Sequence, residues 1–130
     1  MTLVLDTSIL IDIEHNNKLV LKNIGIIKKE HPDTIYITMI SYFEFLLGIK
    51  EKKQHNQKKA LEFLELFPVL SAGKLTATYL ADLKYKYDKQ GLLMSLADLL
   101  IASQVIENNM TLITRDRSFE RIKEMDKIIL

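Results

Sequence analysis

The sequence contains no cysteine, which excludes disulfides, thiolate-bound metals and cysteine nucleophiles together. No apolar run approaches the roughly 18 residues that a bilayer-spanning helix needs, so no association with a membrane is expected. The first ten residues, MTLVLDTSIL, lack a basic segment and already contain an aspartate, unlike a secretory signal peptide. We therefore expect a cytoplasmic protein.

An excess of charge of one sign is also missing. The 18 Lys and Arg residues nearly balance 17 Asp and Glu residues, so the net charge of +1 neither predicts nor excludes a nucleic-acid partner. Any basic surface must arise from local clustering. The length of 130 residues fits one compact domain over residues 1–130, and the hydrophobic share of 48% is enough to build a core.

Short apolar segments alternate with helical patterns along the chain. Leu3–Leu5 contains no polar residue, as expected of a strand buried on both faces, and the β-branched residues of 34–39 and 111–114 predict two more strands. Short strands are expected at 69–70 and 128–130. Helical patterns are found at 9–13, 17–30, 41–50, 60–67 (with the polar segment 51–59 as a loop or as its start), around 80–90, at 95–107 and at 119–125. This alternation predicts an α/β layer fold with a mainly parallel sheet.

Acidic residues fall where predicted strands give way to helices. Asp6 follows the first strand directly, and Asp116 comes at the end of the strand over 111–114. Glu44 lies one turn into the helix after the second strand, and Asp98 lies in the first turn of the helix over 95–107. Because ligands of open parallel sheets bind beyond the carboxyl ends of the strands, the four acids could face the same edge.

Each of these acids also has an ordinary structural explanation. The first and the last can cap the helices after them. Ser41 with Glu44, and Ser95 with Asp98, match the capping-box pattern, in which the acid reaches back to the amide of the cap residue. Taken singly, each acid therefore leaves both interpretations open.

Taken together, the acids favour a metal site. Glu44 and Asp98 lie in the apolar segments FEFLLG and LADLLIA, where burying an ionised group is costly unless a cation or donors satisfy it. Acids gathered on one edge would also repel one another without a counter-charge. Ligands that are all carboxylates suit Mg²⁺ or Mn²⁺ rather than zinc. Such a site activates a bound water, and the expected reaction is phosphodiester hydrolysis.

The motifs LDTSIL, SYFEFLLG, ADLLIAS and TLITRDRSFERI, in this order, resemble the PIN-domain family, and most of all the short VapC-type toxins of type II toxin–antitoxin pairs. The resemblance covers essentially the whole chain. It implies that the catalytic, metal-binding acids, here called the acidic quartet, are Asp6, Glu44, Asp98 and Asp116. It also matches Thr7 and Thr114 to hydroxyl residues that support the site by hydrogen bonding, although strand-end capping explains both equally well.

The resemblance further implies a three-layer α/β/α sandwich with a central, mainly parallel sheet, a Mg²⁺ or Mn²⁺ cofactor, RNA as the substrate and a homodimer. Proteins of this type are held inactive by a VapB-type antitoxin, whose peptide segment fills the groove beside the acids. Some members carry a further acid shortly before the third of the quartet. Met94 and Ser95 occupy those positions here, which puts any mechanism with a fifth carboxylate in doubt. The expected function is that of a metal-dependent endoribonuclease, the toxin of a VapBC-type pair.

Three functions of other classes compete with the nuclease. A phosphatase or phosphotransferase with an aspartyl nucleophile usually has a second acid two residues after the first, and that position is Ser8. A receiver-like phosphorylation switch needs an acceptor aspartate after the strand at 69–70, where only Ser71, Ala72 and Gly73 are found. A catalytically silent PIN-like module that binds RNA or protein is the main alternative, because four intact acids do not guarantee turnover.

Binding of RNA needs cations near the acids, since carboxylates alone would repel the phosphates. Arg115 and Arg117 flank Asp116, and Arg121 lies about one helical turn farther on. Of these we expect Arg115 to hold the RNA, because of its place beside the metal.

Other basic and aromatic residues carry weaker signals. Lysines gather over 50–59 and 84–89, where a solvated helix face is the commoner explanation. Tyr79, Tyr85 and Tyr87 could stack on bases, but their helical spacing favours packing in the core or in a dimer.

Overall fold

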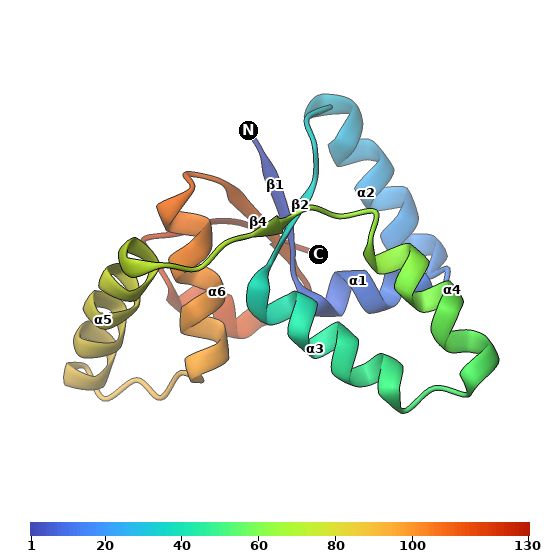
Figure 1. Cartoon of the computed structure of the whole chain (residues 1–130). Helices are drawn as coiled ribbons and strands as arrows, with labels where there is room; N and C mark the ends of the chain where they lie inside the picture. Colours follow the sequence, from blue (N-terminus) through green and yellow to red (C-terminus); the bar gives the residue numbers. More distant parts are fainter.

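The computed structural model describes residues 1–130 and is built around a sheet of five strands, each parallel to its neighbours (Figure 1). The strand order is β3-β2-β1-β4-β5. The strands are β1 Leu3–Leu5, β2 Tyr36–Thr38, β3 Val69–Leu70, β4 Thr111–Thr114 and β5 Asp126–Ile129. The prediction of an α/β fold with a mainly parallel sheet is confirmed.

Helices cover both faces of this sheet. They are α1 Thr7–Glu14, α2 Lys18–Glu30, α3 Met39–Lys50, α4 Gln54–Leu64, α5 Lys74–Lys89, α6 Leu96–Glu107 and the short 3-10 helix η1 Arg117–Arg121. The first four helices lie on one side of the sheet, and α5 and α6 lie on the other, which gives the expected three layers (Figure 1). None of the helices is both long enough and apolar enough to cross a bilayer.

The apolar run of β1 serves two hydrophobic cores. Leu3 and Leu5 pack with residues of α1 to α4, whereas Val4 between them packs with residues of α5 and α6. In the neighbouring strand β4, Ile113 and Leu112 divide between the same two cores. Successive side chains of a strand point to opposite faces, so β1, with helices on both sides, buries all three of its side chains. Asp6 therefore directly follows a fully buried strand.

The junction of β2 and α3 differs from the prediction. The strand ends at Thr38, whose Oγ1 accepts a hydrogen bond from the backbone N–H of Ser41 at 3.2 Å. Thr38 is thus the N-cap, and the helix begins at Met39, two residues earlier than predicted. The proposed capping box of Ser41 with Glu44 is wrong, because Glu44 lies well inside the helix.

A buried glutamine joins the helices that carry two of the acids. The side chain of Gln104 in α6 is fully buried; its Oε1 accepts from the N–H of Met39 at 3.1 Å, and its Nε2 donates to the carbonyl of Leu70 at 2.9 Å. A buried amide that satisfies both of its ends in this way fixes its neighbours firmly. The start of α3, which carries Glu44, is thereby held against α6, which carries Asp98.

Other boundaries also differ from the sequence prediction. Helix α4 begins at Gln54, so most of the polar segment is the start of a helix, and it ends at Leu64 rather than near Pro68. Phe67 lies beyond its end but still packs on the core, with its ring 5.3 Å from that of Phe63. The helical turn expected at 119–125 is the shorter η1, and the last strand begins at Asp126.

Candidate active site

Asp6 is the buried member of the acidic quartet and lies at the N-terminus of α1. Its carboxylate accepts hydrogen bonds from the N–H of Thr7 at 2.7 Å, the hydroxyl of Ser8 at 3.3 Å and the hydroxyl of Thr114 at 2.7 Å. The side chain does cap the helix, as the structural explanation proposed. Only 6% of the residue is exposed, however, which is far more burial than a helix cap requires.

Thr114, at the end of β4, connects Asp6 to Asp116. Its fully buried hydroxyl donates to Asp6 and accepts from the N–H of Asp116 at 2.9 Å. The carboxylate of Asp116 is exposed and caps η1 by accepting from the N–H of Ser118 at 2.9 Å. One hydroxyl therefore sets the positions of two acids that come from neighbouring strands.

Asp98 belongs to the same chain of contacts, but it lies in α6, on the other side of the sheet from α1 and α3. The hydroxyl of Ser118 donates to its Oδ2 at 3.2 Å, and the hydroxyl of Ser95, the N-cap of α6, accepts from its N–H at 3.0 Å. Ser118 thus contacts Asp98 through its side chain and Asp116 through its backbone. Asp98 is half-buried.

Glu44 completes the set through Thr7. The Thr7 hydroxyl donates to Oε1 of Glu44 at 2.7 Å, while its N–H donates to Asp6. Glu44 itself is exposed, so the expectation that its apolar segment buries it is wrong. The apolar neighbours of Glu44 include Phe45, which turns into the core while the glutamate remains at the surface.

Hydroxyl groups alternate with acids around this edge. All four members of the quartet are linked by hydrogen bonds through Thr7, Thr114 and Ser118, and Ser8 adds a further contact to Asp6. Sequence reasoning included the two threonines but missed both serines. Their signal was a hydroxyl residue two positions after each aspartate that ends a strand.

Two acids at this edge, Asp98 and Asp6, have a raised pKa. Burial raises the pKa of the Asp98 carboxyl first, and the negative charges of Asp116 and Glu44 raise it further. Burial also raises the pKa of Asp6, against the hydrogen bonds of Thr114, Thr7 and Ser8, and the charge of Asp98 adds to the increase. The acids therefore destabilise one another's ionised forms, as expected of carboxylates gathered without a counter-charge.

The arginines beside Asp116 already have carboxylate partners. Nη1 of Arg115 lies 3.0 Å from Oδ2 of Asp12 in α1, and about half of the arginine side chain is exposed. Arg117 lies 2.6 Å from Glu120 within η1. Arg115 directly precedes Asp116, but its guanidinium is paired with Asp12 within the protein, a contact that the sequence did not indicate.

The match to a known family covers all of these elements except β5. The sequence matches the family model of the PIN domain over residues 3–125, a range that includes the whole acidic quartet. The chain belongs to the PIN-domain family. This PIN domain is similar to the ribonuclease VapC of Rickettsia bellii, with 31% identity over 132 residues, 97% of this chain and 94% of that protein. It is also similar to the ribonuclease VapC2 of Rickettsia felis, with 32% identity over 96 residues, 72% of each chain.

Solved structures show the same architecture. The PIN domain superposes on a chain of VapBC2 from Rickettsia felis bound to a DNA fragment from its promoter, with a TM-score of 0.86 and 26% identity, covering 100% of this chain and 99% of that one. VapBC-1 from nontypeable Haemophilus influenzae gives a TM-score of 0.83 at 24% identity, covering 99% and 98%, and supports the fold alone.

Replacing Thr114 tests whether the hydroxyl positions the acids of this PIN domain. Thr114→Val keeps the shape of the side chain but removes the donor to Asp6 and the acceptor for Asp116. We expect cleavage of RNA to fall by about 10- to 100-fold, the usual effect of losing a group that orients residues of an active site. We also expect the free energy of unfolding to fall by about 1–3 kcal/mol, because buried polar groups lose their partner.

The matched control is Thr111→Val, in a buried residue of the same strand that forms no hydrogen bond with either acid. Activity is measured on an RNA substrate, and stability by denaturant unfolding. A Thr114 variant as active as the Thr111 variant would show that this hydroxyl has only a structural role.

Proposed function

We propose that this PIN domain is a metal-dependent endoribonuclease that hydrolyses phosphodiester bonds, and that it is the toxin of a VapBC-type toxin–antitoxin pair. The observation that carries the proposal is the acidic quartet, with four carboxylates linked through hydroxyl groups at one edge of the sheet. Relatives named as VapC ribonucleases support the same assignment over up to 97% of the chain.

A hard divalent cation fits this set of donors. Every candidate ligand is a carboxylate oxygen, the kind of donor that Mg²⁺ and Mn²⁺ prefer, and neither cysteine nor histidine is among them. No three acidic or histidine side chains form a closed cluster that could hold an ion. The need for a counter-charge is indicated instead by the raised pKa of Asp98 and Asp6. The residues that would hold Mg²⁺ or Mn²⁺ are Asp6, Glu44, Asp98 and Asp116.

When bound, such an ion lowers the pKa of a coordinated water and stabilises the negative charge on a phosphate group. The side chains of the protein supply position. Thr114 holds Asp6 and Asp116 together, Ser118 adds Asp98, and Thr7 adds Glu44. Because the hydroxyls already donate to Asp6, Glu44 and Asp98, they hold these carboxylates in fixed orientations, which reduces the cost of organising the site.

The partners proposed for this chain come from the same assignment. Its substrate is RNA, its regulator is a VapB-type antitoxin, and its assembly is a homodimer in the cytoplasm. Solved relatives include VapBC complexes from Rickettsia felis and Salmonella typhimurium, both bound to DNA. For Arg115 to hold RNA as well, its guanidinium must contact phosphate with the donors that Asp12 leaves free.

The deciding experiment is cleavage of a structured RNA pool by purified protein, stripped of any antitoxin that co-purifies. We expect cleavage with Mn²⁺ or Mg²⁺, none in EDTA, and none by Asp6→Asn. The control is Asp33→Asn, which removes the same charge from an exposed loop and should cleave like wild type. If the RNA stayed intact both with Mn²⁺ and with Mg²⁺, the nuclease would be refuted and a catalytically silent binding module would be favoured.

A further inference from the structure

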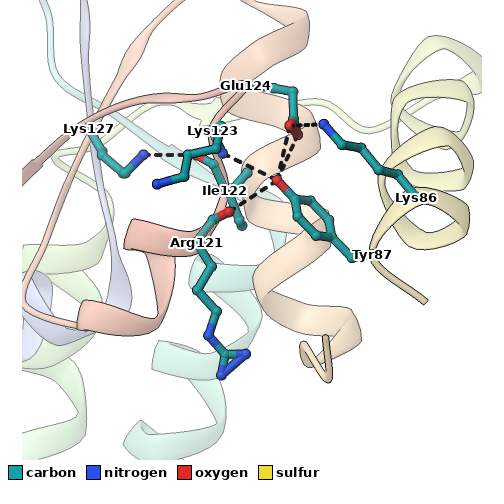
Figure 2. Close-up of polar contacts among 7 residues, drawn as sticks. All are labelled: Lys86, Tyr87, Arg121, Ile122, Lys123, Glu124 and Lys127. Atoms are coloured by element: carbon teal, nitrogen blue, oxygen red, sulfur yellow. Dashed lines mark hydrogen bonds and ion pairs between the residues drawn. The ribbon is translucent and has the colours of Figure 1, made fainter. Parts of the chain in front are cut away.

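A second polar cluster lies on the α5 side of the sheet and is centred on the hydroxyl of Tyr87 (Figure 2). This hydroxyl lies 3.0 Å from both carboxylate oxygens of Glu124 and 3.1 Å from the carbonyl of Arg121, and it accepts from the N–H of Lys123 at 3.2 Å. Lys86 pairs with the same Glu124 at 2.8 Å. Tyr87 is 2% exposed, so it packs in the core as predicted and cannot stack on a base. It anchors α5 to the segment directly after η1.

A cationic hollow lies beside this anchor, with a volume of about 300 Å³. Three of its lining residues are cationic and none is acidic. The lining consists of Lys86, Tyr87, Gln90, Leu92, Arg121 and Lys123. The ammonium of Lys123 has no carboxylate within ion-pair distance. Arg121 has none either, and its Nη1 donates to the carbonyl of Leu93 at 3.0 Å, which orients the guanidinium while leaving other donors free.

These two cations differ from the arginines that flank Asp116. Arg115 and Arg117 must share their charge with Asp12 and Glu120. Arg121 and Lys123 can neutralise an external anion without breaking an ion pair, whereas Lys86 is already paired with Glu124. In Figure 2 the side chain of Arg121 extends away from the Tyr87 hydroxyl. The internal network therefore fixes the backbone of Arg121 without occupying its guanidinium.

The hollow is also close to the acidic quartet along the chain. Helix η1 runs from Asp116, its N-cap, to Arg121, a distance of about 10 Å at the usual rise of roughly 2 Å per residue. The loop that contains Leu92 leads directly into the first turn of α6 and to Asp98. A separation of this size is short enough for one RNA strand to contact both the quartet and the hollow.

We propose that the hollow binds a backbone phosphate of the RNA strand that the quartet cleaves. The proposal rests on the proposed function, which supplies RNA as the ligand. The planar guanidinium of Arg121 can donate two parallel hydrogen bonds to phosphate oxygens, and Lys123 adds a second positive charge. The charged groups of the lining are all cations, which match a phosphate, and a contact with the backbone is independent of sequence.

The test is the salt dependence of RNA binding, measured in EDTA by fluorescence anisotropy with a labelled single-stranded RNA. Each lost phosphate contact lowers the slope of log K against log salt by about 0.7. Arg121→Gln with Lys123→Gln removes this one contact and should therefore lower the slope by about 0.7. Between about 50 and about 200 mM salt, the loss of affinity should become about 2.6-fold smaller than for wild type.

Two further variants keep the result interpretable. Lys22→Gln with Lys29→Gln removes the same charge from exposed positions of α2 and should leave the slope unchanged. Lys123→Gln alone breaks no side-chain hydrogen bond and should also lower the slope, even if loss of the Arg121 contact to Leu93 disturbs the fold of the double variant.

Equal slopes for the hollow variants and the α2 control would refute the phosphate contact. Cleavage by the wild type is scored separately, in Mn²⁺. Cleavage with equal slopes would leave the nuclease intact and refute the hollow. Unequal slopes without cleavage would support the hollow as a nucleic-acid contact and refute the nuclease.

Discussion

Asp98→Asn is expected to lower the rate of RNA cleavage by more than about 100-fold and at the same time to raise the thermal stability of the metal-free protein. Loss of a group that only orients a metal ligand costs about 10- to 100-fold, and loss of a ligand should cost more. The gain in stability has a different cause. Burial first, and then the charges of Asp116 and Glu44, raise the pKa of Asp98. The neutral amide keeps the shape of the carboxylate, is less costly to bury and no longer repels these two acids.

The pH dependence of this gain is set by the direction of the pKa shift. The pKa of Asp98 in the folded protein lies above its ordinary value of 3.8, so folding favours the protonated form. The contribution of Asp98 to the free energy of unfolding is fully present below the ordinary pKa of an aspartate. It is lost as the pH rises through the raised pKa that Asp98 has in the folded protein. The melting temperature of the variant should therefore exceed that of wild type by an amount that grows from acidic to neutral pH. Because Asp98 is half-exposed, the difference should be only a few °C.

The control is again Asp33→Asn, measured by the same cleavage assay and by thermal melting in EDTA. It should show full activity and no growing stability difference, because Asp33 is exposed and forms no ion pair. A variant of Asp98 that loses stability together with activity would mean that the carboxylate is needed for the fold. That outcome would remove Asp98 from the list of metal ligands.

The edge on which the acids lie could be predicted because it depends on local patterns. The buried run Leu3–Leu5 and the segment 111–114 are strands by composition, and parallel strands place the residues after their carboxyl ends at one edge. The positions of Asp6 and Asp116 result directly from this rule. The position of Asp98 results from the N-cap at Ser95, which the structure retains.

The environment of each acid could not be predicted, since it depends on packing between distant segments. The start of α3 is fixed by Thr38 and by Gln104, which lies 65 residues away, so the nearer serine looked like the cap. The pairing of Arg115 with Asp12 requires α1 to lie beside the end of β4. Helix α3 turns Phe45 inward and Glu44 outward, a rotation that its apolar sequence alone does not define.

Addition of Mn²⁺ is expected to raise the melting temperature of the wild-type protein, and EDTA should reverse the increase. An ion that binds only the folded chain stabilises it by about 2.7 kcal/mol at 100 times its dissociation constant. For a domain of this size, this corresponds to an increase on the order of 10 °C. The ion also removes the repulsion within the quartet, so wild type should overtake Asp98→Asn once Mn²⁺ is present.

The increase should shrink as the pH falls, and the raised pKa of Asp6 and Asp98 gives the reason. Both carboxyls must lose their protons to bind a cation, and burial makes this loss harder than in water. The shift should be greatly reduced in Asp6→Asn and Asp98→Asn but retained in Asp33→Asn. If Mn²⁺ raised the melting temperature of all three variants as much as that of wild type, the ion would bind elsewhere on the protein. The quartet would then lack the metal on which the proposed chemistry depends.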